Sequence, residues 1–155
     1  MKISILYGTE TGNAEMLAED IQAELEAAHD VSCDNLADTD PAALDPTRLY
    51  LMVCSTYGDG ELPASAKPFA EAMDETSPDL SNVHFAIFGL GDSEYEETFN
   101  GGPKLLAELM IARGAKQIGE RVAHDASGPD LAEDIAFPWA EQVVAEAEER
   151  LGAPA

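Results

Sequence analysis

Gly8-Thr9-Glu10-Thr11-Gly12-Asn13 joins an apolar run at residues 3–7 to a pattern typical of a helix. Backbone N–H groups in the first turn of a helix have no partner within the helix, and the helix dipole is positive there. A phosphate fits such a place, and threonine hydroxyls can donate to it. Residues 8–13 contain no Lys or Arg, which excludes a Walker A site. They also lack the third glycine of a dinucleotide-binding fingerprint. The alternative is a plain strand-to-helix turn, capped by Thr11 or Asn13.

Strand-like and helix-like patterns alternate along the whole chain. Apolar runs indicate five strands, at residues 2–7, 31–36, 49–54, 83–88 and 116–122. Helical spacing and helix-terminal residues indicate helices at residues 14–28, 41–44 (one turn), around 69–73, from 103 to just before Gly114, and at 135–151. Pro138 should kink the last helix or mark a break in it. This alternation predicts an α/β fold with one parallel sheet and helices on both faces.

The length of 155 residues suits one domain with a complete core. The chain begins with Met1 and has neither the pattern of a signal peptide nor an apolar run long enough to span a membrane. Cys33 and Cys54 each fall in a predicted strand, where packing is the favoured role. We therefore expect a protein of the reducing cytoplasm without a disulfide bond.

The formal net charge is −23, from 31 acidic and 8 basic side chains. This charge argues strongly against nucleic acid or an anionic membrane surface as a partner, because both would repel the protein. It permits a basic protein partner. A general adaptation to solubility or to high salt explains the charge equally well, and charge alone does not separate the two explanations.

Two further glycine-rich segments follow predicted strands. They are Ser55-Thr56-Tyr57-Gly58-Asp59-Gly60-Glu61-Leu62-Pro63 and residues 89–100. Ligands of open α/β sheets bind beyond the carboxyl ends of the strands, so all three segments are expected at one edge. Tyr57 and Tyr95 could stack on a flat ring whose phosphate lies in the first segment. This combination predicts a mononucleotide cofactor, although each tyrosine taken singly could equally be ordinary surface packing.

The motifs Thr9-Glu10-Thr11-Gly12-Asn13-Ala14, Ser55-Thr56-Tyr57-Gly58-Asp59-Gly60 and Gly89-Leu90-Gly91-Asp92-Ser93-Glu94-Tyr95 resemble, in order and spacing, the three FMN loops of flavodoxins. The similarity covers nearly the whole chain. It is greatest to short-chain flavodoxins of the MioC type and to the FMN domains of sulfite reductase and other diflavin reductases. The resemblance implies FMN as the cofactor and a single-domain, doubly wound sheet of five parallel strands in the order 2-1-3-4-5. This flavodoxin-like domain would cover residues 1–151, followed by a short C-terminal tail at 152–155.

The resemblance also implies residue roles. Thr9, Thr11 and Asn13, with backbone amides of residues 10–14, would bind the FMN phosphate. Two tyrosines would flank the isoalloxazine, the backbone around Gly58 would face flavin N5, and further residues would line the ring and the ribityl chain. The implied cofactor-binding set is Thr9, Glu10, Thr11, Gly12, Asn13, Ala14, Ser55, Thr56, Tyr57, Gly58, Asp59, Gly60, Leu90, Gly91, Asp92, Tyr95, Phe99, Asn100 and, after the last predicted strand, Asp125.

The sequence departs from the family pattern at two places. Position 14 is Ala where many members have Thr, so one phosphate-binding hydroxyl is missing. Tyr95 and Phe99 are four residues apart where the family usually shows three, which affects the contacts expected after Tyr95. The chain also lacks the long insertion that splits the last strand of long-chain flavodoxins.

Other chemistries fit the sequence less well. A phosphoacceptor response regulator needs acidic residues after the first and third strands, where Gly8-Thr9 and Ser55-Thr56 stand. His29, His84 and His124 make no metal-ligand spacing with one another. We therefore predict no metal site and no catalytic residue.

The predicted role is that of a monomeric, low-potential, one-electron carrier. It would dock a flavoprotein reductase and acceptor redox proteins on its acidic FMN edge and turn over only with them. Two alternatives stay open: an FMN-dependent reductase of a small quinone-type substrate, and a flavin-bound regulatory or assembly subunit. The carrier is favoured because no extra segment is present that could form a nicotinamide or quinone pocket.

Overall fold

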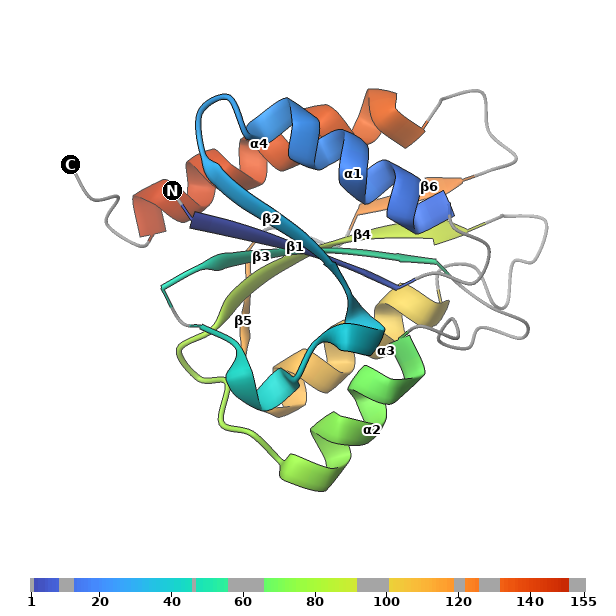
Figure 1. Ribbon diagram of the computed structural model, residues 1–155, viewed down its shortest axis with the longest axis vertical. Helices are drawn as coiled ribbons and strands as arrows, with labels where there is room; N and C mark the ends of the chain where they lie inside the picture. Colours follow the sequence, from blue (N-terminus) through green and yellow to red (C-terminus); the bar gives the residue numbers. More distant parts are fainter. Residues whose placement is uncertain are drawn as a thin grey trace.

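The computed structural model of the chain describes residues 2–8, 13–45, 47–55, 66–91, 101–118, 122–125 and 132–150. Its strands are β1 (Lys2–Gly8), β2 (Asp30–Asn35), β3 (Leu49–Ser55), β4 (His84–Gly91), β5 (Lys116–Gln117) and β6 (Val122–Asp125). All pairings are parallel, and the order is β2-β1-β3-β4-β5, with β6 also paired to β4 (Figure 1). This order confirms the doubly wound parallel sheet.

The fifth position of the sheet is filled by two short strands, β5 and β6, rather than by the single strand predicted at 116–122. His84 and Phe85 of β4 pair with β5, and Phe88 to Gly91 pair with β6. The last residue of β4 paired with β5 is Phe85, opposite Gln117, and the first paired with β6 is Phe88, opposite Val122. The two pairings are thus three residues apart along β4 and five residues apart along the segment from β5 to β6. Because the segment from β5 to β6 has two residues more than β4 over this stretch, the hydrogen-bonded pairing with β4 cannot continue without interruption.

The α-helices that the structure describes cover the two faces of the sheet (Figure 1). They are α1 (Asn13–Leu25), α2 (Lys67–Thr76), α3 (Gly101–Ala112) and α4 (Ala132–Arg150). Helices α1 and α4 lie on one face, and α2 and α3 on the other. Two 3₁₀ turns follow β2, η1 (Leu36–Asp38) and η2 (Pro41–Ala43), and η2 confirms the single turn predicted at 41–44. Over the described ranges, no helix combines the length and the apolar composition that a membrane span requires.

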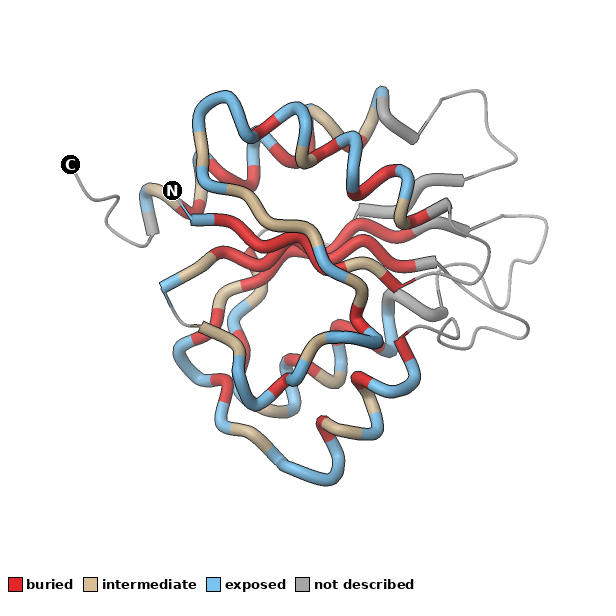
Figure 2. The backbone as a smooth tube through the Cα atoms, viewed as in Figure 1, coloured by how far each residue is buried: buried red, intermediate tan, exposed pale blue. Residues whose placement is uncertain are grey.

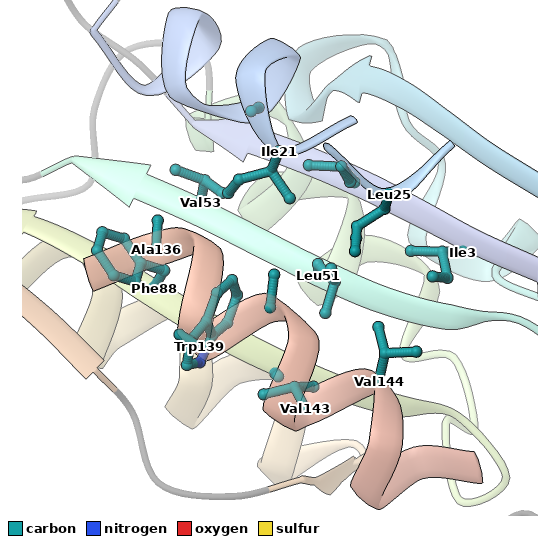
Figure 3. Close-up of a cluster of buried hydrophobic side chains, with 14 of the residues drawn as sticks. Ile3, Ile21, Leu25, Leu51, Val53, Phe88, Ala136, Trp139, Val143 and Val144 are labelled. Atoms are coloured by element: carbon teal, nitrogen blue, oxygen red, sulfur yellow. The ribbon is translucent and has the colours of Figure 1, made fainter. Parts of the chain in front are cut away.

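Each face of the sheet packs its own hydrophobic cluster against its helices, and burial is concentrated in the central strands (Figure 2). In the cluster under α1 and α4, the Trp139 ring lies 5.4 Å from that of Phe88 at an interplanar angle of 54° (Figure 3). β3 contributes Leu51 and Val53 to this cluster and Tyr50 and Met52 to the opposite one. The continuous apolar run 49–54 therefore reflects a strand buried on both faces.

The observed end of α1 corrects one sequence expectation, and the course of α4 excludes one of the two outcomes expected at Pro138. Helix α1 ends at Leu25, the last residue on its core face, and the N–H groups of Ala28 and His29 both donate to the Leu25 carbonyl. The helix therefore ends three residues before the predicted end at residue 28. Helix α4 runs through Pro138 without a break, because Ala136, Trp139 and Ala140 hold it to the core on either side. The predicted end of α3 is confirmed: Gly114 follows it with φ +96°.

Arg48 lies just before β3 and joins the amino-terminal halves of β1 and β2. Its Nε donates to Ser4 Oγ at 2.6 Å, and its terminal nitrogen donates to the Ile3 carbonyl at 2.9 Å. The same nitrogen reaches Ser32 Oγ at 3.4 Å, and the two serine hydroxyls are 3.1 Å apart. Ser4 is buried, so the guanidinium satisfies a polar group that water does not reach.

Candidate functional site

The carboxyl ends of β1, β3, β4 and β6 meet in register at one edge of the sheet. Gly8 pairs with Cys54, Ser55 pairs with Leu90, and Gly91 pairs with Asp125. The three glycine-rich segments predicted from the sequence therefore leave neighbouring strands at the same edge, as expected. Helix α1 follows β1 directly, and its first turn, whose N–H groups have no partner within the helix, belongs to that edge.

Six of the predicted site residues have a described backbone at this edge, namely Asn13, Ala14, Ser55, Leu90, Gly91 and Asp125. Thirteen lie outside the described residues, namely Thr9, Glu10, Thr11, Gly12, Thr56, Tyr57, Gly58, Asp59, Gly60, Asp92, Tyr95, Phe99 and Asn100. The structure thus brings together residues that begin or end the three segments, and the roles implied for all nineteen residues stay predictions.

Ala14 explains one departure from the family pattern. Its side chain is fully buried in the cluster of α1 and α4, beside Leu17 and Ala18. The side chain at this position packs in the core, so only the backbone N–H of Ala14 is available to a phosphate. The methyl group here serves the packing of α1 on the sheet.

Gly8 lies where an added side chain would be crowded. A Cβ atom there would lie 3.1 Å from Ala66 Cβ, 3.1 Å from Leu36 Cδ1 and 3.4 Å from Cys54 Sγ. Ala66 directly follows the stretch 56–65, and Cys54 lies one residue before the end of β3. Gly8, which begins the first glycine-rich segment, therefore lies beside Cys54 and Ala66, the residues on either side of the second glycine-rich segment.

Tyr7, one residue before Gly8, is a residue that the sequence reasoning missed. The carboxylate of Glu15, in the first turn of α1, acts electrostatically on its hydroxyl. Burial and the nearby carboxylate of Glu15 raise the pKa of Tyr7 to about 12. The sequence did offer a sign that Tyr7 differs from its neighbours. It is a tyrosine at the end of the run Ile3-Ser4-Ile5-Leu6-Tyr7, in which the other apolar side chains are aliphatic.

Cys33 lies close to the same acidic side chains. It is half-buried in β2, and burial, with the charges of Glu19, Asp34 and Glu15, raises its pKa to about 11. Cys54, in β3, is almost fully buried, and burial raises its pKa to about 12. Because the thiolate is the reactive form, both groups are poor nucleophiles at neutral pH. Among the described residues, no group of three His, Cys, Asp or Glu side chains is arranged to hold a metal ion.

A doubly wound parallel sheet in this order, with three glycine-rich segments beyond β1, β3 and β4, defines the flavodoxin-like class of α/β proteins. The chain belongs to the flavodoxin family, whose sequence model, described as Flavodoxin, matches residues 5–139. FMN is the cofactor of this chain. The described residues fit FMN, because aligned strand ends and the N–H groups of α1 converge at one edge.

Relatives of two kinds resemble the chain. Protein MioC of Escherichia coli O157:H7 is 36% identical over 137 residues, which cover 88% of this chain and 92% of MioC. NADPH-dependent diflavin oxidoreductase 1 of Cryptococcus neoformans var. neoformans serotype D is 38% identical over 144 residues, 90% of this chain. The chain spans only 23% of that oxidoreductase. A solved structure, that of a cysteine mutant of flavodoxin from Pseudomonas aeruginosa, matches with a TM-score of 0.81 at 33% identity, covering 94% of this chain and 98% of that one.

Proposed function

We propose that the chain is a one-electron carrier that holds FMN at the carboxyl edge of its sheet and passes electrons between a flavoprotein reductase and acceptor redox proteins. The observation that carries this proposal is the alignment of Gly8, Ser55 and Gly91 at adjacent strand ends, each followed by a segment of flavodoxin pattern. In this proposal residues 1–151 form the FMN-binding domain, 152–155 are a tail, and the monomeric protein works in the cytoplasm.

The protein's contribution is to bind and orient the cofactor. FMN, when bound, supplies the one-electron chemistry. In this proposal, N–H groups of the first turn of α1 and the hydroxyls of Thr9 and Thr11 hold the phosphate, and Tyr57 and Tyr95 stack on the ring. The backbone of Gly91 and the residue Asp125, at paired strand ends, line the approach to the ring.

The charges near the site favour a low reduction potential. Residues 8–14, 55–63 and 89–100 carry seven acidic side chains and no Lys or Arg, namely Glu10, Asp59, Glu61, Asp92, Glu94, Glu96 and Glu97. Two like charges about 10 Å apart repel by roughly 1–2 kcal/mol at an effective dielectric constant of about 20. Several carboxylates in segments that carry no Lys or Arg therefore oppose the arrival of further negative charge.

A carrier should turn over only with partner proteins. The purified protein, loaded with FMN, should not oxidise NADPH or NADH in the presence of a quinone. It should be reduced rapidly after a catalytic amount of a flavoprotein reductase is added with NADPH. Stopped-flow absorbance at the flavin bands measures both reactions, and mass analysis of the extracted chromophore checks its identity. Oxidation of NADPH with a quinone by the protein alone would instead support an enzyme.

If partner proteins dock on the acidic edge, the rate of reduction should depend on ionic strength and on which carboxylates are removed. Replacing Glu94, Glu96 and Glu97 by Gln should slow reduction by the reductase at low salt. The slowing should fade near physiological ionic strength, where the Debye length is about 8 Å. Stopped-flow rates across a salt series measure the effect.

The matched control removes three charges between the middle and the far end of α4, with Glu141, Glu148 and Glu149 changed to Gln. Acidic side chains are also exposed along α1 and α2, for example at Glu19 and Glu71. If the two triple variants lose the same rate, the charge acts as a uniform coat and docking at the flavin edge is wrong.

A further inference from the structure

We propose that Met16 is an apolar contact for a basic redox protein that docks beside the cofactor edge. This inference rests on the proposed function, and it extends the docking surface from the edge of the sheet onto α1. Met16 is the fourth residue of α1, so it lies about 4.5 Å along the helix axis from Asn13. That end of α1 lies at the edge where β1, β3 and β4 end (Figure 1).

The Met16 side chain faces solvent, although the residues beside it in the sequence are buried. Met16 is 66% exposed, against 51% for Ile111 and 41% for Leu105, the other large apolar side chains that the structure describes as exposed. Leu17 and Ala18, which follow it, are buried in the core cluster. Met16 therefore lies on the outer face of α1, and the packing of the helix on the sheet does not account for an apolar side chain there.

Acidic side chains surround Met16, and they distinguish it from an ordinary exposed apolar residue. Glu19 and Asp20 lie three and four residues further along, which makes them its neighbours on the helix surface, and both are exposed. Helix α1 contains four acidic residues and no Lys or Arg, whereas α3, the helix of Leu105 and Ile111, contains one Lys and one Glu. An apolar centre within a charged rim is the arrangement of protein docking surfaces, and methionine is enriched in such centres.

The charge around Met16 determines which partner fits. A basic protein is attracted both by α1 and by the acidic segments at the cofactor edge. An acidic protein is repelled, and so is a second copy of this chain, whose formal net charge is −23. In this proposal the carboxylates speed the encounter with a basic protein, and Met16 provides apolar surface that loses water when the two proteins touch.

Electron transfer from the reduced holoprotein to cytochrome c, a basic haem protein, tests the inference. The full chain, loaded with FMN, is reduced anaerobically with stoichiometric dithionite and mixed with ferric cytochrome c. One electron then passes from the bound flavin to each haem iron. Met16→Gln should lower the second-order rate constant about fivefold, on the scale of losing one apolar anchor of an interface. Salt does not screen an apolar contact, so this loss should persist at high ionic strength. Stopped-flow absorbance of the haem measures the rate.

Three variants serve as controls. Glu19→Gln combined with Asp20→Asn should slow the transfer at low salt only, because the Debye length is about 8 Å at physiological ionic strength. Ile111→Gln changes an exposed apolar residue on the other face of the sheet and should leave the rate unchanged. Met16→Leu keeps an apolar side chain and should keep most of the parent rate. Oxidation by benzoquinone, a small neutral oxidant, should be equally fast in all variants, because it requires no docking surface.

Three results would overturn the inference while the carrier function stands. The first is a Met16→Gln variant that reduces cytochrome c as fast as the parent does. The second is equal slowing by Met16→Gln and Ile111→Gln. The third is a parent chain that sediments as a dimer and a Met16→Gln variant that sediments as a monomer, since a second copy would then cover Met16. A reduced parent chain that passes no electrons to cytochrome c would overturn the proposed carrier function together with this inference.

Discussion

Replacing Arg48 with methionine should lower the free energy of unfolding by about 2–4 kcal/mol, since hydrogen bonds to a charged group contribute about 1.5–3 kcal/mol each. The guanidinium donates to Ser4 Oγ, Ser32 Oγ and the Ile3 carbonyl. Methionine keeps an unbranched apolar stem and removes the three contacts, so the buried Ser4 hydroxyl keeps only its contact with Ser32 among the described side chains. Urea unfolding followed by circular dichroism, with FMN in constant excess, measures the change.

Arg113→Met is the matched control for this variant. Arg113 reaches Asp74 at 3.5 Å, and the Asp74 side chain is 72% exposed. An exposed ion pair of this kind contributes about 0–1 kcal/mol. Arg48→Lys should fall between the two, because an ammonium keeps the charge but not the planar fork that spans two strands. Equal destabilisation by Arg48→Met and Arg113→Met would show that the Arg48 network contributes nothing special.

Gly8→Ala should destabilise the fold by about 1–3 kcal/mol, the usual cost of forcing a methyl group into a filled space. It should also weaken FMN binding about tenfold, which corresponds to about 1.4 kcal/mol. The new Cβ would press on Ala66 and Cys54, the two anchors of the second segment, and on Leu36. The crowding should therefore lower both the stability of the fold and the affinity for FMN. Urea unfolding and FMN titration measure its two parts.

The double variant with Leu36→Val separates local crowding from a general loss of structure. Leu36→Val removes the Cδ1 atom that lies 3.1 Å from the added Cβ, so it should restore part of the stability lost in Gly8→Ala. Leu80→Val, a buried change in the same cluster, should add its own cost without coupling. If Leu36→Val and Leu80→Val behave alike in the Gly8→Ala background, crowding at Gly8 is not the cause.

The sequence predicted the sheet well where hydrophobic pattern alone determines structure. The run 49–54 is apolar throughout because β3 is covered on both faces, and Gly114 ends α3 because its φ of +96° suits glycine. The last strand was predicted less well. The division into β5 and β6 depends on how this segment pairs with β4, where it has two residues more than β4. The hydrophobic pattern of one strand does not show which residues it pairs with, so it could not predict this division.

The site was predictable to the level of its segments and their common edge. Glycines, hydroxyls and tyrosines after three strands mark a cofactor edge by local pattern. The raised pKa of Tyr7, due to burial and the charge of Glu15, and the crowding at Gly8 each depend on side chains that the fold brings together. Such tertiary contacts leave no periodic signal in the sequence.

Trp139 gives the protein a built-in optical reporter. It is the single tryptophan of the chain, it is 5% exposed, and its indole N–H has no hydrogen-bond partner among the residues that the structure describes. An indole in such dry, apolar surroundings emits at shorter wavelength than one in water, so unfolding should shift its emission to the red. Phe88, against which it packs, lies on the strand that ends at the cofactor edge. Because flavin absorption overlaps indole emission, energy transfer should dim Trp139 when FMN binds, and one fluorescence spectrum then separates apoprotein, holoprotein and unfolded chain.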